Sequence, residues 1–132
     1  MNKMTKILVI DDSEFDRRMI TSAIRSVCED VDCVELSNGV SAVETIRSES
    51  PELTIIDIRM PGLSGWDVLE QIRADETLKD LKVVMMSGSR AKEDRWKATR
   101  RGAHGYYTKP NKRADYGLVA TDMKNTYLDA AA

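Results

Sequence analysis

The amino-acid sequence predicts an α/β protein: a doubly wound parallel sheet of five strands with five helices. Short apolar runs alternate with longer amphipathic stretches along the chain of 132 residues. Short loops join successive segments, so each strand is followed by a helix that leads back to a neighbouring parallel strand. Strands in such a sheet are covered on both faces, which explains why several runs are almost continuously apolar.

Each element follows from its own spacing of apolar residues. The expected strands are short and mostly apolar, and they span residues 6–10, 31–36, 53–58, 82–86 and 105–108. The expected helices are amphipathic or charged stretches, at 14–27, from 40 to about 50, around 66–72, at 90–101 and at 114–128. Ser13 is a plausible N-cap for the first helix, and Asn38-Gly39 and Pro61-Gly62 are typical of loops.

Composition narrows the class of function. Hydrophobic residues make up 42% of the chain, enough for a core, and the formal net charge of −2 gives no overall basic field. Nucleic-acid binding is therefore not expected as the main activity. The first apolar run, residues 7–10, is too short for a signal peptide or a membrane span, so we expect a cytoplasmic protein without a membrane partner. This length suits one domain, 1–132, with no output domain.

Polar residues stand where four of the five expected strands end. Asp11 and Asp12 follow the first strand, Asp57 lies near the end of the third, Ser87 follows the fourth and Lys109 follows the fifth. The carboxyl ends of parallel strands meet at one edge of the sheet, where ligands bind in such folds. Taken singly, the aspartates could cap a helix or begin a turn, and the lysine could be solvated.

Taken together, these residues indicate a cation site. Clustered carboxylates repel one another, and such a cluster persists most readily when a cation neutralises it. Oxygen ligands with retained waters suit Mg²⁺, which typically binds one or two carboxylates together with phosphate oxygens. The residues therefore favour Mg²⁺ as the cation.

Four motifs, in this order and at these spacings, resemble the signature set of the receiver domains of bacterial two-component response regulators. The motifs are Ile10-Asp11-Asp12-Ser13, Asp57-Ile58-Arg59-Met60-Pro61-Gly62, Ser87-Gly88-Ser89 and Tyr106-Tyr107-Thr108-Lys109-Pro110. The similarity runs from about Lys6 to Pro110. It implies a flavodoxin-like receiver fold with strand order 2-1-3-4-5. It also implies a single-domain, chemotaxis-type response regulator, a phosphoprotein of two-component or phosphorelay signal transduction.

The resemblance assigns the central chemistry to Asp57. Its carboxylate would accept the phosphoryl group from a phosphohistidine on a sensor histidine kinase or a histidine phosphotransfer protein. Mg²⁺ would be held by Asp12, Asp57 and the backbone carbonyl of Arg59, with Asp11 binding through water or orienting the site. Such a protein catalyses only its own phosphorylation and dephosphorylation, so it is not an enzyme acting on a separate substrate.

The resemblance also assigns residues that respond to the phosphoryl group. Lys109 would pair with one phosphoryl oxygen and Ser87 would donate its hydroxyl to another, and the Lys109–Pro110 bond is expected to be cis. Tyr106, three residues before the lysine, matches the switch aromatic of the family, whose ring moves inward when Ser87 shifts. The alternative is an aromatic that only packs at the edge of the sheet.

The surface formed by the fourth helix, fifth strand and fifth helix is the expected partner site. A homodimer or a target protein would bind there through Trp96, Tyr106 and Tyr116. Trp96 is interpreted as a core anchor, with an exposed contact residue as the alternative. The side chain of Arg59, two residues after Asp57, either shields the acyl phosphate from water, attracts acidic groups of a partner or is solvated.

Other functions fit the residues less well. Phosphatases with an aspartate nucleophile carry an Asp-x-Asp motif on the first strand, whereas Asp11 and Asp12 are adjacent here. A pseudo-receiver, which binds proteins without phosphorylation, is the main alternative, although the complete set of acids with Ser87 and Lys109 argues against it. A receiver fragment of a transcription factor or hybrid kinase has no support in this chain. Within the family, a phosphorelay intermediate and a direct effector both stay open.

Overall fold

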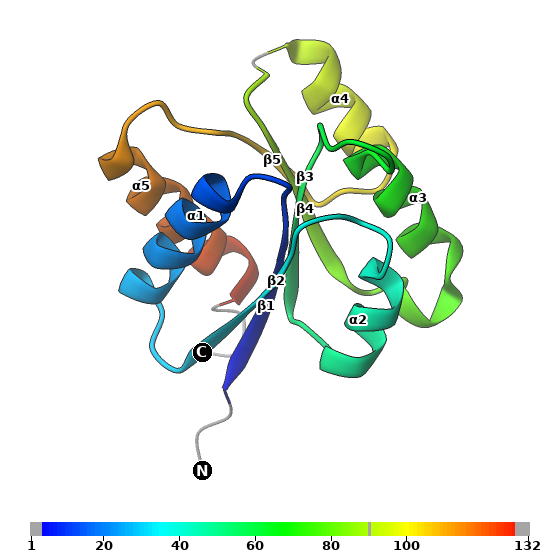
Figure 1. Cartoon of the computed structure of the whole chain (residues 1–132), viewed down its shortest axis with the longest axis horizontal. Coiled ribbons are helices and arrows are strands. Elements are labelled where there is room, and N and C mark those ends of the chain that lie inside the picture. The colour runs from blue at the N-terminus through cyan, green and yellow to red at the C-terminus, as the bar shows by residue number, and fades with distance from the viewer. Residues whose placement is uncertain (1–3, 90, 129–132) are drawn as a thin grey trace.

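The computed structural model describes residues 4–89 and 91–128, which form a parallel β-sheet flanked by helices (Figure 1). The strands lie in the order β2-β1-β3-β4-β5, and every neighbouring pair is parallel. Their bounds are β1 (Thr5–Ile10), β2 (Val31–Leu36), β3 (Leu53–Asp57), β4 (Lys82–Ser87) and β5 (Gly105–Thr108). The predicted doubly wound sheet and its strand order are confirmed.

Helices cover both faces of the sheet. Helices α1 and α5 lie on one side, and α2, α3 and α4 lie on the other (Figure 1). Their bounds are α1 (Glu14–Val27), α2 (Ala42–Glu49), α3 (Gly65–Ala74), α4 (Lys92–Arg100) and α5 (Arg113–Met123). A short 3₁₀ turn, η1 (Glu76–Leu78), precedes β4, and a π-helical turn, η2 (Lys124–Leu128), follows α5.

Two hydrophobic clusters, one on each face of the sheet, form the core. Successive strand residues point to opposite faces, so Ile7 and Val9 pack beneath α1 and α5, whereas Leu8 and Ile10 pack beneath α2 and α3. All four side chains are almost fully buried. This burial on both faces explains the continuously apolar runs in the sequence.

Local side-chain hydrogen bonds fix where several helices begin. The Ser13 hydroxyl accepts the backbone N–H of Asp16 at 3.1 Å, which confirms Ser13 as the N-cap of α1. Ser64 and Asp67 form a reciprocal capping box at the start of α3. The Asn38 side chain accepts the N–H of Val40 at 3.0 Å, and this turn delays α2 to Ala42, two residues after the predicted start.

The structure corrects two predictions about aromatic residues. Trp96 is 63% exposed, so the interpretation as a core anchor is wrong, and its role as a partner contact stays a prediction. Tyr116 was expected to contact a partner, but it is only 5% exposed, because its ring belongs to the cluster that joins α1 and α5 to the sheet. Within the described residues no helix is long and apolar enough to cross a membrane.

Candidate functional site

Three aspartates meet at the carboxyl edge of the sheet. Strands β1 and β3 pair with Ile10 opposite Ile56, a register that places the following residues, Asp11 and Asp57, side by side. Asp11 and Asp57 are buried, whereas Asp12 is exposed. One carboxylate oxygen from each of Asp11, Asp12 and Asp57 lies within 4.8 Å of the other two. The sequence therefore predicted this cluster correctly.

Lys109 reaches the same cluster from the end of β5. Its backbone N–H donates to the Ser87 carbonyl at 2.7 Å, which continues the pairing of β4 with β5. Its Nζ lies 2.8 Å from Asp11 Oδ2, 3.0 Å from Asp57 Oδ1 and 2.8 Å from Asp16 Oδ2. One ammonium group thus bridges carboxylates from the residue after β1, from β3 and from α1.

Burial makes two carboxylates of this cluster, those of Asp11 and Asp57, difficult to ionise. Burial, and then the negative charge of Asp11, raises the pKa of Asp57 to about 6 despite the nearby ammonium of Lys109. Burial also raises the pKa of Asp11. Burial alone would lower the pKa of Lys109, but its hydrogen bonds and ion pairs with the carboxylates outweigh this effect and raise that pKa. Lys109 therefore stays charged, but its single positive charge does not offset the effect of burial on Asp11 and Asp57.

The donor set fits a hard divalent cation. Mg²⁺ prefers carboxylate and other oxygen ligands, and it usually retains several waters. The exposed position of Asp12 leaves room for such waters, and a single lysine cannot neutralise three aspartates. Arg59 lies in the loop directly after β3, and its side chain is exposed. The role of its backbone carbonyl as a cation ligand stays a prediction.

Ser87 and Tyr106 are linked through the loop that follows β4. The Ser87 side chain is buried, and its hydroxyl accepts the N–H of Ser89 at 3.2 Å. The Tyr106 ring is 8% exposed, and its hydroxyl donates to the Ser89 carbonyl at 2.6 Å. The guanidinium of Arg95 on α4 lies 5.3 Å from the centre of that ring. The ring thus occupies an inward position and contacts both the loop and α4.

Comparison with known proteins agrees with this geometry. The model of the response regulator receiver domain family matches residues 7–119.

The chain belongs to the response regulator receiver domain family. The chemotaxis protein CheY-3 of Vibrio cholerae serotype O1 is 34% identical over 110 residues, covering 83% of this chain and 84% of that protein. The chemotaxis protein CheY of Pseudomonas aeruginosa is 33% identical over 105 residues, covering 80% and 84% respectively.

Solved receiver structures share the fold. The phosphorylated cyanobacterial phytochrome response regulator RcpA matches with a TM-score of 0.87 and 24% identity, covering 98% of both chains. The Mn²⁺-bound form of the response regulator Rcp1 matches with a TM-score of 0.83 and 22% identity, covering 97% of both. These likenesses concern the arrangement of helices and strands.

One backbone prediction for this receiver domain is wrong. The Lys109–Pro110 peptide bond is trans, not cis. The trans form of a bond before proline is favoured by about 0.5–1 kcal/mol unless its surroundings select cis. In the trans form the N–H of Lys109 still pairs with Ser87, and the side chain still reaches the aspartates.

Two residues of α1 join the receiver site without having been predicted from the sequence. Asp16 binds Lys109, and Arg17 donates to the Asp11 carbonyl at 2.6 Å and to Glu35 on β2 at 3.1 Å. Both lie in the first turns of the helix that begins directly after the Asp11-Asp12 pair. That position, one helical turn from a strand end, is the feature of the sequence that could have identified them.

Gly65 is a third residue of the site that the sequence pattern did not predict. It begins α3, and its N–H donates to the Ile58 carbonyl at 2.8 Å. A Cβ atom at this position would lie 2.3 Å from the backbone oxygen of Asp57. Only glycine allows α3 to approach the backbone of Asp57 so closely.

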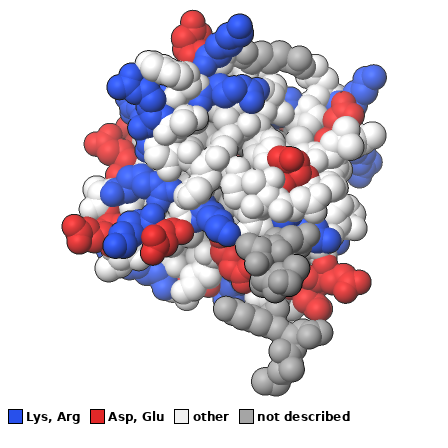
Figure 2. All heavy atoms as spheres, turned by 180° about the vertical axis from the view of Figure 1, so that it is seen from behind, with Lys and Arg blue, Asp and Glu red and all other residues white. Residues whose placement is uncertain are grey.

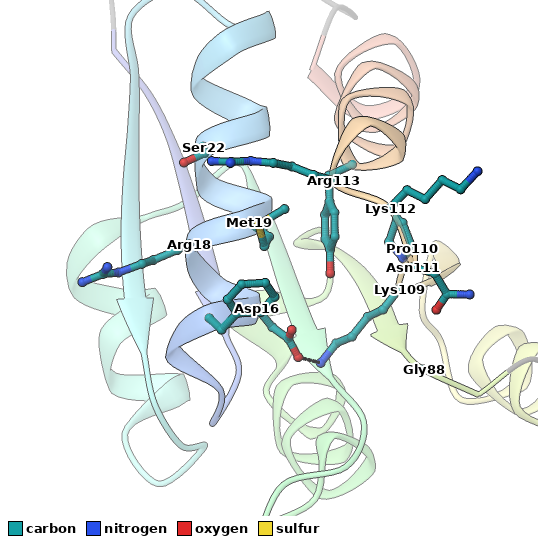
Figure 3. A pocket seen from close by; sticks show the side chains of 12 residues that line it. Asp16, Arg18, Met19, Ser22, Gly88, Lys109, Pro110, Asn111, Lys112 and Arg113 are labelled. Carbon is teal, nitrogen blue, oxygen red and sulfur yellow. Dashed lines mark hydrogen bonds and ion pairs between the residues drawn. The ribbon is translucent and has the colours of Figure 1, made fainter.

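A pocket of about 570 Å³ opens beside the site, between α1 and the loop that joins β5 to α5 (Figure 3). Asp16 and Lys109 line it and are joined across it by their ion pair, as the dashed line shows. Basic side chains of Arg18, Lys112 and Arg113 also line the pocket. The exposed ring of Phe15 and the buried ring of Tyr116 supply apolar surface.

Proposed function

We propose that this receiver domain is a single-domain response regulator that accepts a phosphoryl group from a phosphohistidine on Asp57. The observation that carries the proposal is the position of Asp57, which lies 3.0 Å from Lys109 and within a cluster of three aspartates suited to a divalent cation. Family membership and the similarity to proteins named CheY support the same role.

The reaction needs positioning and neutralisation of charge more than covalent help from the protein. A carboxylate oxygen of Asp57 forms a bond to phosphorus while the bond from phosphorus to the histidine nitrogen breaks, and the departing imidazole takes up a proton. Asp12, Asp57 and the Arg59 carbonyl, with Asp11 nearby, would hold Mg²⁺, which would supply positive charge to the transferring group. Lys109 pairs with one phosphoryl oxygen of the product, and the Ser87 hydroxyl donates to another.

The result is a signalling module and not an enzyme with its own substrate. It catalyses only the gain and loss of its own phosphoryl group. The phosphoryl group adds about −1.5 to −2 charges and favours one of two conformations that the domain already samples. Tyr106 is the residue that transmits this change, since its ring contacts both the loop after β4 and α4.

A sensor histidine kinase or histidine phosphotransfer protein is the proposed phosphodonor, and the output surface lies on α4, β5 and α5. Trp96 and Leu118 there are 63% and 70% exposed, so a target protein or a second copy would contact these side chains. Figure 2 shows a broad area of mostly uncharged side chains, with an acidic side chain inside it and charged side chains around it, on the face seen from behind; such an area suits a protein partner better than nucleic acid. We place the protein in the cytoplasm, with neither nucleic acid nor membrane as partner.

The test is incubation with Mg²⁺ and acetyl phosphate, followed by measurement of the intact mass. One added phosphoryl group is expected, absent from Asp57→Asn and absent when Mg²⁺ is chelated beforehand. Beryllofluoride, which mimics the phosphoryl group, provides a second measurement. A protein that binds neither ligand would be a pseudo-receiver that acts by protein binding alone, and the proposal would fail.

A further inference from the structure

Asp16 binds the same ammonium group as the proposed phosphoacceptor. Its Oδ2 lies 2.8 Å from Lys109 Nζ, whereas Asp57 Oδ1 lies 3.0 Å from it. Asp16 does not belong to the group of aspartates that could hold a cation, which in the described part of the chain comprises Asp11, Asp12 and Asp57. Its carboxylate therefore competes for the lysine without contributing a ligand to the cation.

The position of Asp16 is fixed by helix α1. The residue lies three positions after the N-cap, and its backbone N–H donates to the Ser13 hydroxyl. Its side chain is 26% exposed and faces the pocket between α1 and the loop after β5 (Figure 3). One side of the carboxylate thus holds Lys109 while the other stays open to solvent and to molecules that enter the pocket.

The distance between the two competing carboxylates makes the competition strong. The oxygens of Asp16 and Asp57 lie within 3.0 Å of the same nitrogen, so they are at most about 6 Å apart, a range over which one charge shifts the ionisation of another. We infer that Asp16 is a positioning residue. It holds the ammonium group of Lys109 partly on helix α1 and away from Asp57, and thereby limits how readily the site accepts an anionic phosphodonor. This inference rests on the proposed phosphorylation of Asp57.

Two consequences of opposite direction follow from this arrangement. Without the charge of Asp16, Lys109 has only Asp11 and Asp57 as partners and competes more strongly with Mg²⁺ for them, so Mg²⁺ binds more weakly. Once Mg²⁺ is saturating, however, Lys109 is more available to phosphoryl oxygens, and one negative charge fewer repels the donor. Phosphorylation is then faster, and the gain grows with the negative charge of the donor. General damage to the site would instead impair both processes.

The experiment compares Asp16→Asn and Asp16→Glu with the wild-type protein. Mg²⁺ affinity is measured by calorimetry. The second-order rate constant of phosphorylation at saturating Mg²⁺ is measured by intact mass, with acetyl phosphate and with the less negatively charged phosphoramidate. We expect Asp16→Asn to weaken Mg²⁺ binding about threefold, and to accelerate phosphorylation by acetyl phosphate about fivefold, with a smaller gain for phosphoramidate. Asp16→Glu keeps the charge and is expected to stay near wild type.

Glu14→Gln is the matched control. Glu14 also lies in the first turn of α1, but it pairs with Arg18, and both side chains are more than two-thirds exposed. This variant removes the same charge from the same helix end without touching Lys109, so both measurements should stay unchanged.

Two sets of results would overturn the inference. Equal rate changes for the two phosphodonors, or unchanged Mg²⁺ affinity in Asp16→Asn, would show that Asp16 does not compete with Asp57 for the ammonium group of Lys109. An Asp16→Glu protein that behaves like Asp16→Asn would show that the charge is not responsible. A wild-type protein that takes no phosphoryl group from either donor would instead contradict the proposed function, and the Mg²⁺ titrations would still decide whether Asp16 restrains Lys109.

Discussion

Asp57, the proposed phosphoacceptor, lies in surroundings that destabilise its charged form at a cost to the folded state. The residue is 5% exposed and close to a second buried aspartate, Asp11, so its negative charge is poorly solvated and repelled. Lys109 compensates for only part of this cost, because the same ammonium group also binds Asp11 and Asp16. The charged form of Asp57 is therefore destabilised, and a bound cation or the loss of this charge would relieve the destabilisation.

Replacing Asp57 with asparagine should stabilise the protein in a pH-dependent way. The pKa of Asp57 is about 6 in the folded protein, above its ordinary value of 3.8, so the folded state binds this proton more tightly than the unfolded state. The stability that this proton provides is present at low pH and is lost as the pH rises through 6. We expect the advantage of Asp57→Asn over wild type to grow by about 2 kcal/mol between pH 4.5 and pH 7.5. Urea unfolding without divalent cations measures it.

Glu14→Gln, which replaces an exposed carboxylate of α1, serves as the control for this measurement. It should show a much smaller change over the same range of pH. A difference between Asp57→Asn and wild type that does not vary with pH would contradict the raised pKa of Asp57.

At the scale of single elements, the site depends on how closely the helix starts approach the strand ends. Helix α1 begins directly after Asp11-Asp12 and contributes Asp16 and Arg17. Helix α3 begins at Gly65, which contacts the backbone of Asp57. The strand ends thus carry the proposed reacting groups, and the first turns of the helices contact them.

Gly65→Ala should therefore damage the protein, whereas Gly117→Ala should not. A Cβ atom at residue 65 would meet the backbone oxygen of Asp57 at 2.3 Å, and the backbone cannot rotate away as a side chain could. We expect a loss of about 1–3 kcal/mol and slower phosphorylation. Gly117 lies inside α5, and a methyl group there would meet nothing within 4 Å, so alanine should stabilise the helix by about 0.4–1 kcal/mol. Denaturant unfolding of both variants provides the test, and a stable Gly65→Ala protein would contradict it.

The bounds of helices and strands could be predicted from the sequence where they depend on neighbouring residues. The bounds of α1, β2 and β5 match, because apolar spacing and the Ser13 cap depend on neighbouring residues. The place of Asp16 one helical turn after a strand end indicates only that it lies near the site, and its contact with Lys109 was not predicted because the two residues are 93 positions apart. The burial of Tyr116 and the exposure of Trp96 depend on how α5 and α4 pack, which a thin apolar pattern does not determine.

At the scale of the whole molecule, α4 is the element best suited to move. Of residues 92–100, all of which the structure describes, only Ala98 is buried. The helix also contacts β5 through Arg95, which stacks on Tyr106, and the Tyr106 hydroxyl holds the Ser89 carbonyl in the loop before α4. Few apolar contacts oppose a shift of this helix, so a small change at Ser87 can alter the surface around Trp96.

Tyr106→Phe should uncouple the site from this surface. The variant loses the 2.6 Å hydrogen bond to Ser89 but keeps the ring, so we expect a modest loss of stability, about 1 kcal/mol, and unchanged binding of Mg²⁺ with beryllofluoride. Beryllofluoride should shift the amide NMR signals of residues 92–100 in the wild type and shift them much less in the variant. Tyr107→Phe is the matched control, because its hydroxyl donates to Asp122 at 2.5 Å on the opposite face of the sheet. Equal shifts in all three proteins would show that the Tyr106 hydroxyl does not transmit the signal, and α4 would then have to respond through Ser87 and the loop backbone alone.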